Sequence, residues 1–357
     1  MKPVDIVQAR LSNQLLGKKK CETAAETVAC LGAVQAQDFA GAKWALGARM
    51  RRATDADVET AFNDGAILRT HVMRPTWHFV APQDIHSLLA LTASRVHAAN
   101  AHMYRKLELD SMLLSRCHAV FTKALGRDRY LTRSELADCL AEDRIEAAGL
   151  RLAYILMHAE LEALICSGPR RGKQFTYALF EERVPRGKKP HRAEALAQWA
   201  FRYFASHGPA QLKDFSWWSG LTMLDARLGL DLATPQLARE IVDGKTYWFT
   251  PDSKNVRLGS STALLLSVYD EYTLAYEDRS ALCAERYIEK LLSMGNSLTS
   301  VLILDGKIAG TWKRLVKRGT VEIMSNPFRP LRKVERESLE AAVASYAKFL
   351  GVPCVLS

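Results

Sequence analysis

The fold is decided by residues 63–80, which read NDGAILRTHVMRPTWHFV. Asn, Asp and Gly at 63–65 predict the end of a helix, because these residue types favour turns and helix ends. Residues 67–73 and 76–80 are then predicted to be two short strands. Arg74-Pro75 lies between them, so the stretch is expected to end a local unit in a hairpin.

The chain before this hairpin is predicted to be helical. Apolar side chains three or four residues apart indicate helices over 4–16 and 23–34, and residues 40–51 are expected to form a third. Thr54 is a plausible N-cap for the next helix, with acidic residues in its first turn. Helices followed by a hairpin are the order of a winged helix.

A similar order occurs twice more. The second unit is expected to contain a long helical stretch over 83–125, a helix that starts at Thr132 and a strongly apolar helix over 150–165. Two strands, at 164–167 and 175–179, are expected on either side of a basic loop. The third is expected to contain two helices, a further helix capped by Thr222 and a hairpin turning at Asp243-Gly244, the first two at 193–206 and 212–219. We therefore predict three tandem winged-helix units.

The last hundred residues have a different character. Strands over 299–304, 307–316 and 320–324 predict an antiparallel meander, and 331–350 has the apolar stripe of a final helix. The predicted fold class is α+β, mainly helical, with three winged-helix units and a C-terminal antiparallel β domain that carries a terminal helix. The expected domains are 1–125, 126–190, 191–255 and 256–357.

Composition indicates a globular protein and excludes several classes. The 357 residues are 48% hydrophobic and 25% charged, and no apolar run approaches the ~20 residues of a membrane helix. The first residues lack an apolar signal core, so we expect a cytoplasmic protein. Seven scattered cysteines and nine histidines show neither a C-x-x-C pair nor a metal-binding spacing. We therefore expect no metal, no cofactor and a monomer.

The net charge of +10 is concentrated on predicted wings, linkers and hairpins. Clustered cations on exposed loops suit the phosphates of nucleic acid, although any single cluster fits a solvated surface equally well. Three clusters together with three winged helices favour DNA. The expected DNA-binding residues are Arg49, Arg51, Arg52, Arg69, Arg74, Arg170, Arg171, Lys173, Arg186, Lys188, Lys189, Lys313 and Arg314.

Familiar catalytic motifs are mostly missing from the sequence. The loop 168–174 is one residue short of a phosphate-binding loop and has Gln174 where a magnesium-binding hydroxyl is needed, so we interpret it as a basic wing. Neither G-x-G-x-x-G nor G-x-S-x-G occurs. Asp270 and Glu271 follow an apolar strand, where adjacent side chains face opposite ways. One structural hydrogen bond and one surface charge are expected there.

Gln35-Ala36-Gln37 is the most informative short segment. On a helix, residues two apart lie about 200° from one another, so the two glutamines share a face only where the backbone is extended or turning. The segment follows an apolar helix, and we expect it at a helix end. Taken alone, the segment favours two surface glutamines without a catalytic role.

Several stretches together resemble the winged-helix DNA-binding family of AlkZ-type DNA glycosylases. They are 31–38, 68–80, 159–169, 206–210, 214–221, 269–272 and 308–312. The resemblance implies three winged helices joined by a β domain into a C-shape around duplex DNA, and a hairpin that engages DNA near the lesion. It also implies a catalytic Q-Φ-Q motif, here Gln35 and Gln37 around Ala36.

The chemistry of these side chains restricts the substrate. Glutamine amides do not titrate near neutral pH, so they orient water rather than act as bases. That suffices when the base leaves readily, as a cationic N7-alkylguanine does. Asp38 is an alternative water activator, or alternatively the N-cap of the next helix. We therefore expect a monofunctional, metal-independent DNA glycosylase that acts on cationic alkylated purines, including interstrand crosslinks. One alternative is a winged-helix regulator without catalytic activity. The other is a family member that acts on a different substrate.

Overall fold

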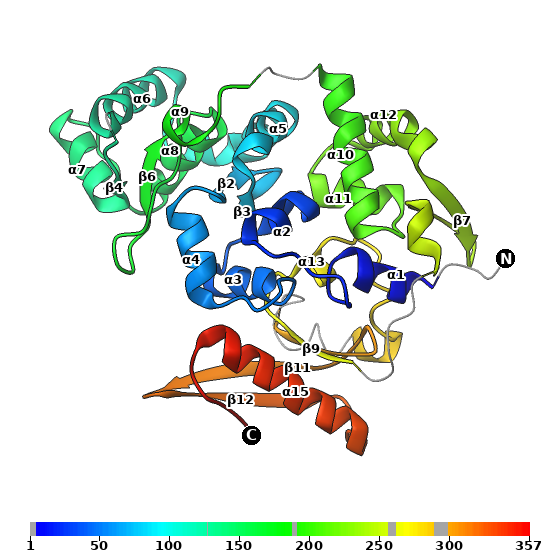
Figure 1. The fold of residues 1–357 in the computed structure, drawn as a ribbon. Helices are drawn as coiled ribbons and strands as arrows, with labels where there is room; N and C mark the ends of the chain where they lie inside the picture. The colour runs from blue at the N-terminus through cyan, green and yellow to red at the C-terminus, as the bar shows by residue number, and fades with distance from the viewer. Residues whose placement is uncertain (1–4, 127, 188–190, 256–261, 289–298) are drawn as a thin grey trace.

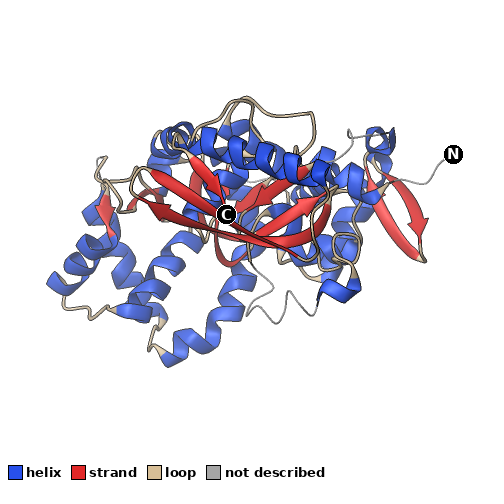
Figure 2. Cartoon of the chain, turned by 90° about the horizontal axis from the view of Figure 1, so that it is seen from below, coloured by secondary structure: helices blue, strands red, loops and turns tan. Residues whose placement is uncertain are grey.

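The computed structural model describes residues 5–126, 128–187, 191–255, 262–288 and 299–357. It is a mixed α+β structure in which helices surround several small sheets, and a larger sheet lies near the C-terminus (Figure 2). The expected fold class is confirmed at this level. Lys188 and Lys189 lie outside the described residues.

The first unit builds a small sheet from strands on both sides of two helices. Its three antiparallel strands have the order β1-β3-β2, so the strand before α3 pairs with the second strand of the hairpin. After α1 (Ile6–Asn13), its elements are α2 (Ala24–Leu31), β1 (Ala33–Gln35), α3 (Phe39–Gly47), α4 (Asp55–Asn63), β2 (Leu68–Val72) and β3 (Arg74–Val80). The predicted hairpin and the Thr54 cap are confirmed, but the chain turns at Met73, and Arg74 and Pro75, expected between the strands, begin β3.

One helix boundary in this unit differs from the sequence expectation. The helix expected over 23–34 ends at Leu31, because Gly32 has a φ of +86° and turns the chain. Residues 33–35 then continue as a strand. This places Gln35 in a strand and Gln37 at a bend before the N-cap of α3, rather than at the end of α2.

The second unit repeats the order and has the sheet β4-β6-β5. The single helical stretch expected over 83–125 is two helices, because Glu108 has a φ of +53° and Asp110 caps a new start. The elements are η1 (Pro82–Asp84), α5 (Ile85–Lys106), α6 (Ser111–Leu125), β4 (Leu131–Thr132), α7 (Arg133–Glu142), α8 (Gly149–Leu161), β5 (Ile165–Ser167), β6 (Thr176–Leu179) and α9 (Phe180–Arg183).

The third unit has the same order with a reduced first strand. Ala210 alone pairs with Trp248 of the hairpin, in the place that β1 and β4 occupy in the other units. The predicted turn at Asp243-Gly244 is confirmed, since both residues have a positive φ. The elements are α10 (Arg192–His207), α11 (Leu212–Ser219), α12 (Met223–Ala233), η2 (Thr234–Gln236), β7 (Ala238–Val242), β8 (Lys245–Phe249) and η3 (Pro251–Asn255).

The C-terminal part is a five-stranded sheet of order β13-β12-β11-β10-β9, flanked by α15. The predicted meander and final helix are confirmed, and two further strands extend the sheet at its edges. The elements are β9 (Ala263–Leu266), α13 (Glu271–Leu274), β10 (Val301–Leu304), β11 (Lys307–Lys317), β12 (Thr320–Pro327), α15 (Lys333–Leu350) and β13 (Cys354–Leu356). Trp44 of α3 packs against Tyr346 and Phe349 of α15, which joins this part to the first unit.

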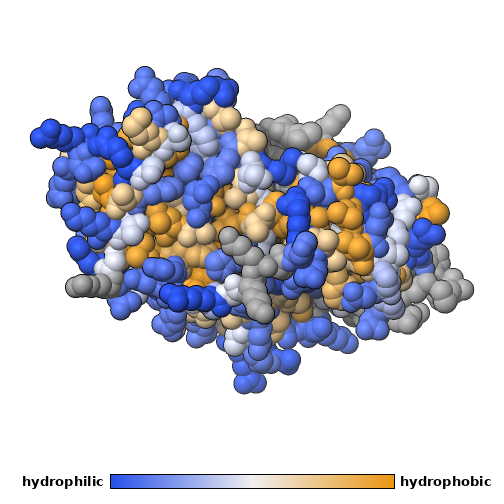
Figure 3. Space-filling model, turned by 90° about the horizontal axis from the view of Figure 1, so that it is seen from above, coloured by the Kyte–Doolittle hydropathy of each residue, from blue (hydrophilic) through white to orange (hydrophobic). Residues whose placement is uncertain are grey.

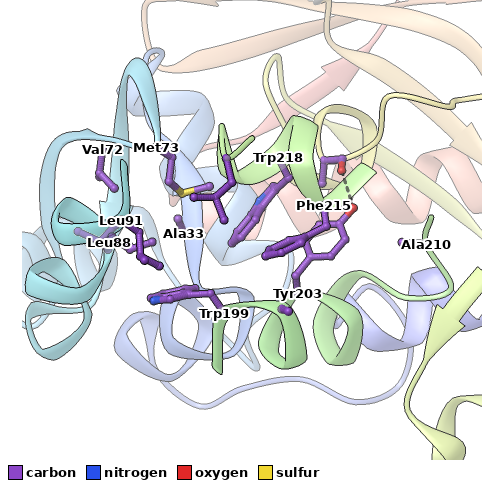
Figure 4. Packing of buried hydrophobic residues seen from close by; sticks show 14 of the residues in the cluster. Ala33, Val72, Met73, Leu88, Leu91, Trp199, Tyr203, Ala210, Phe215 and Trp218 are labelled. Carbon is purple, nitrogen blue, oxygen red and sulfur yellow. Dashed lines mark hydrogen bonds between the residues drawn. The ribbon is translucent and has the colours of Figure 1, made fainter. Parts of the chain in front are cut away.

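The first and third units share one hydrophobic core. Figure 4 shows Trp199, Tyr203 and Trp218 of the third unit facing Met73 and its neighbours from the first. The packing is close at Gly220, where an added Cβ would lie 2.2 Å from the Met73 carbonyl oxygen. The β2–β3 hairpin is therefore held tightly against α11.

The surface combines hydrophilic and apolar areas. Viewed from above, apolar side chains gather in the middle of the face and hydrophilic ones surround them (Figure 3). In the residues that the structure describes, no helix has both the length and the apolar character needed to cross a membrane.

Candidate active site

Gln35-Ala36-Gln37 runs along the edge of the first sheet. Gln35 is the last residue of β1 and lies opposite His78 of β3. The Ala36 N–H donates to the Trp77 carbonyl at 2.7 Å, so the extended pairing continues past the strand. The strand ends at Gln35, and Gln37 lies at the bend that leads into α3. Gln35 is 7% exposed, Ala36 is fully buried and Gln37 is exposed.

Asp38 caps the helix that follows the motif. Its Oδ1 accepts the Gly41 N–H at 2.7 Å, and its own backbone is extended, as at a typical N-cap. The capping interpretation is therefore confirmed. The residue is also exposed, next to Gln37.

A buried carboxylate lies directly against the motif. Glu271 Oε1 accepts the Gln35 N–H at 2.9 Å, and Oε2 accepts the Trp218 indole N–H at 3.0 Å. His207 Nε2 lies 3.6 Å from Oε2, and both side chains are almost completely buried. Burial opposes ionisation of Glu271, but the facing His207, the Gln35 amide and Arg74 outweigh it, so its pKa lies below the usual range. An anion is thus fixed beside Gln35.

The acidic pair at 270–271 differs from its sequence interpretation. The two residues begin the short helix α13, and both are buried, so the expected surface charge is wrong. Asp270 caps α13 and pairs with both terminal nitrogens of Arg49, at 2.7 and 2.9 Å. Arg49 is fully buried and also donates to two backbone carbonyls. Its guanidinium is occupied inside the protein, which argues against the phosphate contact expected from the sequence.

The sheet face that carries Gln35 also carries polar atoms without protein partners. Residues 74, 76 and 78 alternate onto this face of β3, and Thr70 lies opposite His78. Buried polar atoms are nearly always hydrogen-bonded, so a group of exceptions indicates water or a ligand. The buried atoms without a partner among the described residues include Thr70 Oγ1, Arg74 Nη2, Thr76 Oγ1, His78 Nε2 and His207 Nε2.

Burial shifts the pKa values of two of these groups. Burial, with Arg74 nearby, lowers the pKa of His78 to about 3. Burial also lowers the pKa of Arg74, although Glu271 opposes this shift. At neutral pH the face therefore offers a neutral imidazole and two hydroxyls beside the glutamines.

Arg69 links the motif to a neighbouring cavity. Its Nε donates to the Ala36 carbonyl at 2.9 Å, and its guanidinium lies 4.2 Å from the ring centre of Trp77 and 4.7 Å from that of Phe175. Burial lowers its pKa to about 10, so it stays charged at neutral pH. A cavity of about 350 Å³ opens beside it, lined by Arg69, Trp77, Thr132, Arg133, Ser134, Lys173, Gln174, Phe175 and Tyr177. Cations and aromatic rings from the first two units meet there.

Of the other predicted basic residues, Lys173 lines this cavity and Arg170 lies against the same Phe175 ring. Several pair within the protein: Arg51 with Glu22, Arg170 with Glu59, Arg171 with Glu135, and Arg314 with the Tyr346 hydroxyl. The exposed ones include Arg52, Lys173, Arg186 and Lys313. Sequence reasoning missed Glu271, His207, His78 and Trp218 as neighbours of the motif. The acid pair after an apolar strand was the one available signal.

Comparison with known proteins identifies the family. The model of the AlkZ-like DNA glycosylases matches residues 28–349. This chain belongs to the AlkZ-like DNA glycosylase family. The resemblance drawn from the sequence motifs is confirmed, and membership supports an enzyme of DNA repair with DNA as its substrate.

A relative from Streptomyces sahachiroi agrees with this assignment. The curated "Interstrand DNA cross-link repair glycosylase" of that organism is 23% identical over 369 residues, covering 97% of each protein. The solved structure of Streptomyces sahachiroi DNA glycosylase AlkZ superposes with a TM-score of 0.81 at 21% identity, over 100% of both chains. The AlkZ-like chain therefore shares that fold over its full length.

Proposed function

We propose that this AlkZ-like protein hydrolyses the N-glycosidic bond of cationic alkylated purines in duplex DNA, with N7-alkylguanine as the simplest substrate. The observation that carries the proposal is the placement of Gln35 at the end of β1, backed by the Glu271 carboxylate, with Gln37 exposed two residues later. Interstrand crosslinks joined through N7 of guanine belong to the same class. The name of the Streptomyces relative supports their inclusion.

The three repeated units serve in this proposal as winged helices. Each has a helix, a strand or single bridge, two helices and a hairpin, with the first strand paired to the last. Such units position a protein on duplex DNA mainly through phosphate contacts, which carry no sequence information. The C-terminal sheet then acts as the scaffold that joins them.

The proposed reaction needs no strong acid and no metal. The C1′–N9 bond breaks, and its electron pair neutralises the cationic purine, which leaves as a neutral base. Gln35 and Gln37 orient a water molecule, whose oxygen bonds to C1′ while its proton passes to solvent. No lysine nucleophile is involved, so the enzyme is monofunctional.

Glu271 serves as a positioning residue in this scheme. It fixes the Gln35 backbone, and in this proposal its negative charge stabilises the sugar cation that develops during the reaction. A fixed charge in a water-poor site stabilises such a cation far more than it would in water. Both Glu271 oxygens already accept hydrogen bonds, and the side chain is buried, so it does not remove the proton of the attacking water.

The cavity beside Arg69 is proposed to hold a backbone phosphate next to the lesion. Arg69, Arg133 and Lys173 supply positive charge there, and the aromatic walls accept an adjacent sugar or base. Exposed Arg52, Arg186 and Lys313 extend the contact. Arg49 is left out, because its charge is neutralised by Asp270.

The test is base release from an oligonucleotide duplex with one N7-methylguanine, followed by alkaline cleavage of the abasic site. We expect cleavage at the lesion, none in matched duplexes with uracil or 8-oxoguanine, and no complex trapped by borohydride. Release of uracil would contradict the proposed substrate class, and a trapped complex would indicate a lysine nucleophile. Tight binding to one undamaged sequence without abasic sites would instead indicate a regulator.

A further inference from the structure

Three histidines and a glutamate meet where the helices of the second unit pack. His97 comes from α5, His118 from α6, and His158 from α8, whose C-cap is Glu162. His97 Nε2 lies 2.9 Å from a Glu162 carboxylate oxygen, and His158 Nδ1 lies 3.1 Å from His118 Nε2. None of these residues belongs to the candidate active site, and the proposed glycosylase chemistry uses none of them.

Two of these residues share one helix face. His158 and Glu162 are four residues apart, a spacing that brings side chains of a helix together. The third partner comes from a distant part of the sequence, which explains why spacing alone did not reveal the group. One ligand atom from each of His97, His158 and Glu162 lies within 4.8 Å of the other two.

Contacts with neighbouring side chains orient the imidazoles of this group. His158 Nδ1 faces His118, which leaves its Nε2 for a ligand. His97 Nδ1 is 2.9 Å from the Tyr104 hydroxyl, and this contact leaves Nε2 to face Glu162. Outer hydrogen bonds of this kind orient metal-binding imidazoles.

We propose that His97, His158 and Glu162 bind one divalent cation of the Zn²⁺ class, with His118 supporting His158. Two nitrogens and one carboxylate oxygen suit Zn²⁺, Co²⁺ or Ni²⁺ and not the oxygen-seeking Mg²⁺ or Ca²⁺. In a tetrahedral zinc site, ligand atoms lie about 3.3 Å apart, since each is ~2.0–2.1 Å from the metal. Small side-chain movements from the present spacing would reach that arrangement.

The bound ion would crosslink α5 to the C-terminal end of α8. Both helices belong to the second unit, α5 near its start and α8 directly before its hairpin. The site therefore acts on the packing within that unit and leaves the chemistry at Gln35 unchanged. Glu162 is half exposed and His97 is 21% exposed, which gives an ion access from solvent.

The test is Zn²⁺ titration of the chelator-treated full chain by calorimetry, with Co²⁺ as a spectroscopic probe. We expect one equivalent to bind, tetrahedral Co²⁺ absorption to appear, and the melting temperature to rise by roughly 2–4 °C at saturating metal. Excision of N7-methylguanine is expected to be equal with and without the ion. If the glycosylase proposal fails, these binding measurements remain valid by themselves.

Variants assign the ligands. His97→Asn and Glu162→Gln should each weaken Zn²⁺ binding by at least about tenfold. His102→Asn, at an exposed position on the same helix, is the matched control and should bind Zn²⁺ normally. Glu162 lies at the surface, so its variant is expected to fold, as circular dichroism will check. No binding at 1:1 stoichiometry, or unchanged binding in the His97→Asn/Glu162→Gln double variant, would overturn the proposal.

Discussion

The β2–β3 hairpin of the first unit and the β7–β8 hairpin of the third occupy the same place in the repeated order but have opposite environments. All five residues of β2 are buried, whereas β7 alternates between half-buried and exposed, with Ile241 73% exposed. The first hairpin is enclosed by α5, α8 and Gly220 at the end of α11, and it contributes Thr70, Thr76 and His78 to the polar face beside Gln35. A hairpin therefore contributes to a site when neighbouring helices bury it, and its place in the repeated order of elements does not decide this.

The two hairpins also differ in charge. The third carries two cations and two acids over 238–249, so it has no net charge. One of its cations, Lys245, pairs with Asp278 at 2.7 Å. We therefore expect the third hairpin to contribute little to DNA binding, in contrast to the surroundings of the first. Four measurements test this difference, in order of decreasing expected effect.

The largest effect is expected where the buried ion pair supports the first unit. Asp270→Asn leaves the Arg49 charge without a carboxylate in a dry environment, which costs about 3–5 kcal/mol. Urea unfolding gives this free energy. Asp243→Asn at the exposed turn of the third hairpin is the control and should change it by less than about 0.5 kcal/mol. A loss below ~1 kcal/mol for Asp270→Asn would contradict the importance of the pair.

The next effect concerns catalysis. Gln35→Ala and Gln37→Ala should each slow single-turnover excision by roughly one to three orders of magnitude, the scale of removing a positioned polar group. DNA affinity should stay nearly constant. Gln236→Ala, an exposed glutamine of the third unit, should excise at the wild-type rate. Full activity of the Gln35→Ala/Gln37→Ala double variant would refute the assignment of the motif.

The third measurement is the pH dependence of the free energy of unfolding. The pKa of folded His78 is about 3, below its ordinary value near 6.5, so the unfolded chain takes up a proton first and acid favours unfolding. Between pH 6 and pH 4 this residue should lower stability by about 1.4 kcal/mol per pH unit. His78→Gln should flatten the profile by that amount, whereas exposed His191→Gln should leave it unchanged. Identical slopes for all three proteins would show that His78 is not buried and neutral.

The smallest effect is on salt dependence. If about six phosphates are contacted, log K should fall with log salt at a slope of about −5. Lys173→Ala and Arg133→Ala, beside the first hairpin, should each reduce that slope by ~0.9. Arg239→Ala in the third hairpin should have no effect. Equal losses at all three positions would mean that both hairpins contact DNA.

The sequence predicted elements whose determinants are local. Thr54 and Thr132 cap helices through acidic residues three positions later, and Asp243-Gly244 supplies the positive φ values that its turn needs. These contacts span a few residues and can be recognised without the fold. The family resemblance likewise rested on short contiguous stretches.

The surroundings of the site could not be predicted in this way. Arg49 was grouped with Arg51 and Arg52 as a surface cluster, because its carboxylate partner is 221 residues away. One acid of the pair Asp270 and Glu271 was expected to be a surface charge, since nothing local shows that an indole and a backbone amide enclose Glu271. The burial of a charged side chain depends on partners that are distant in the sequence, and the spacing of residues along the chain does not reveal those partners.

The bond between the Gln35 amide and Glu271 spans 236 residues, and this has a consequence for synthesis on the ribosome. At ~5–20 residues per second, the anion follows the glutamine by roughly 10–50 s. During that interval the first unit has its motif but lacks the carboxylate that supports it. A nascent or truncated chain ending before α13 should therefore carry both glutamines and remain inert toward the genome.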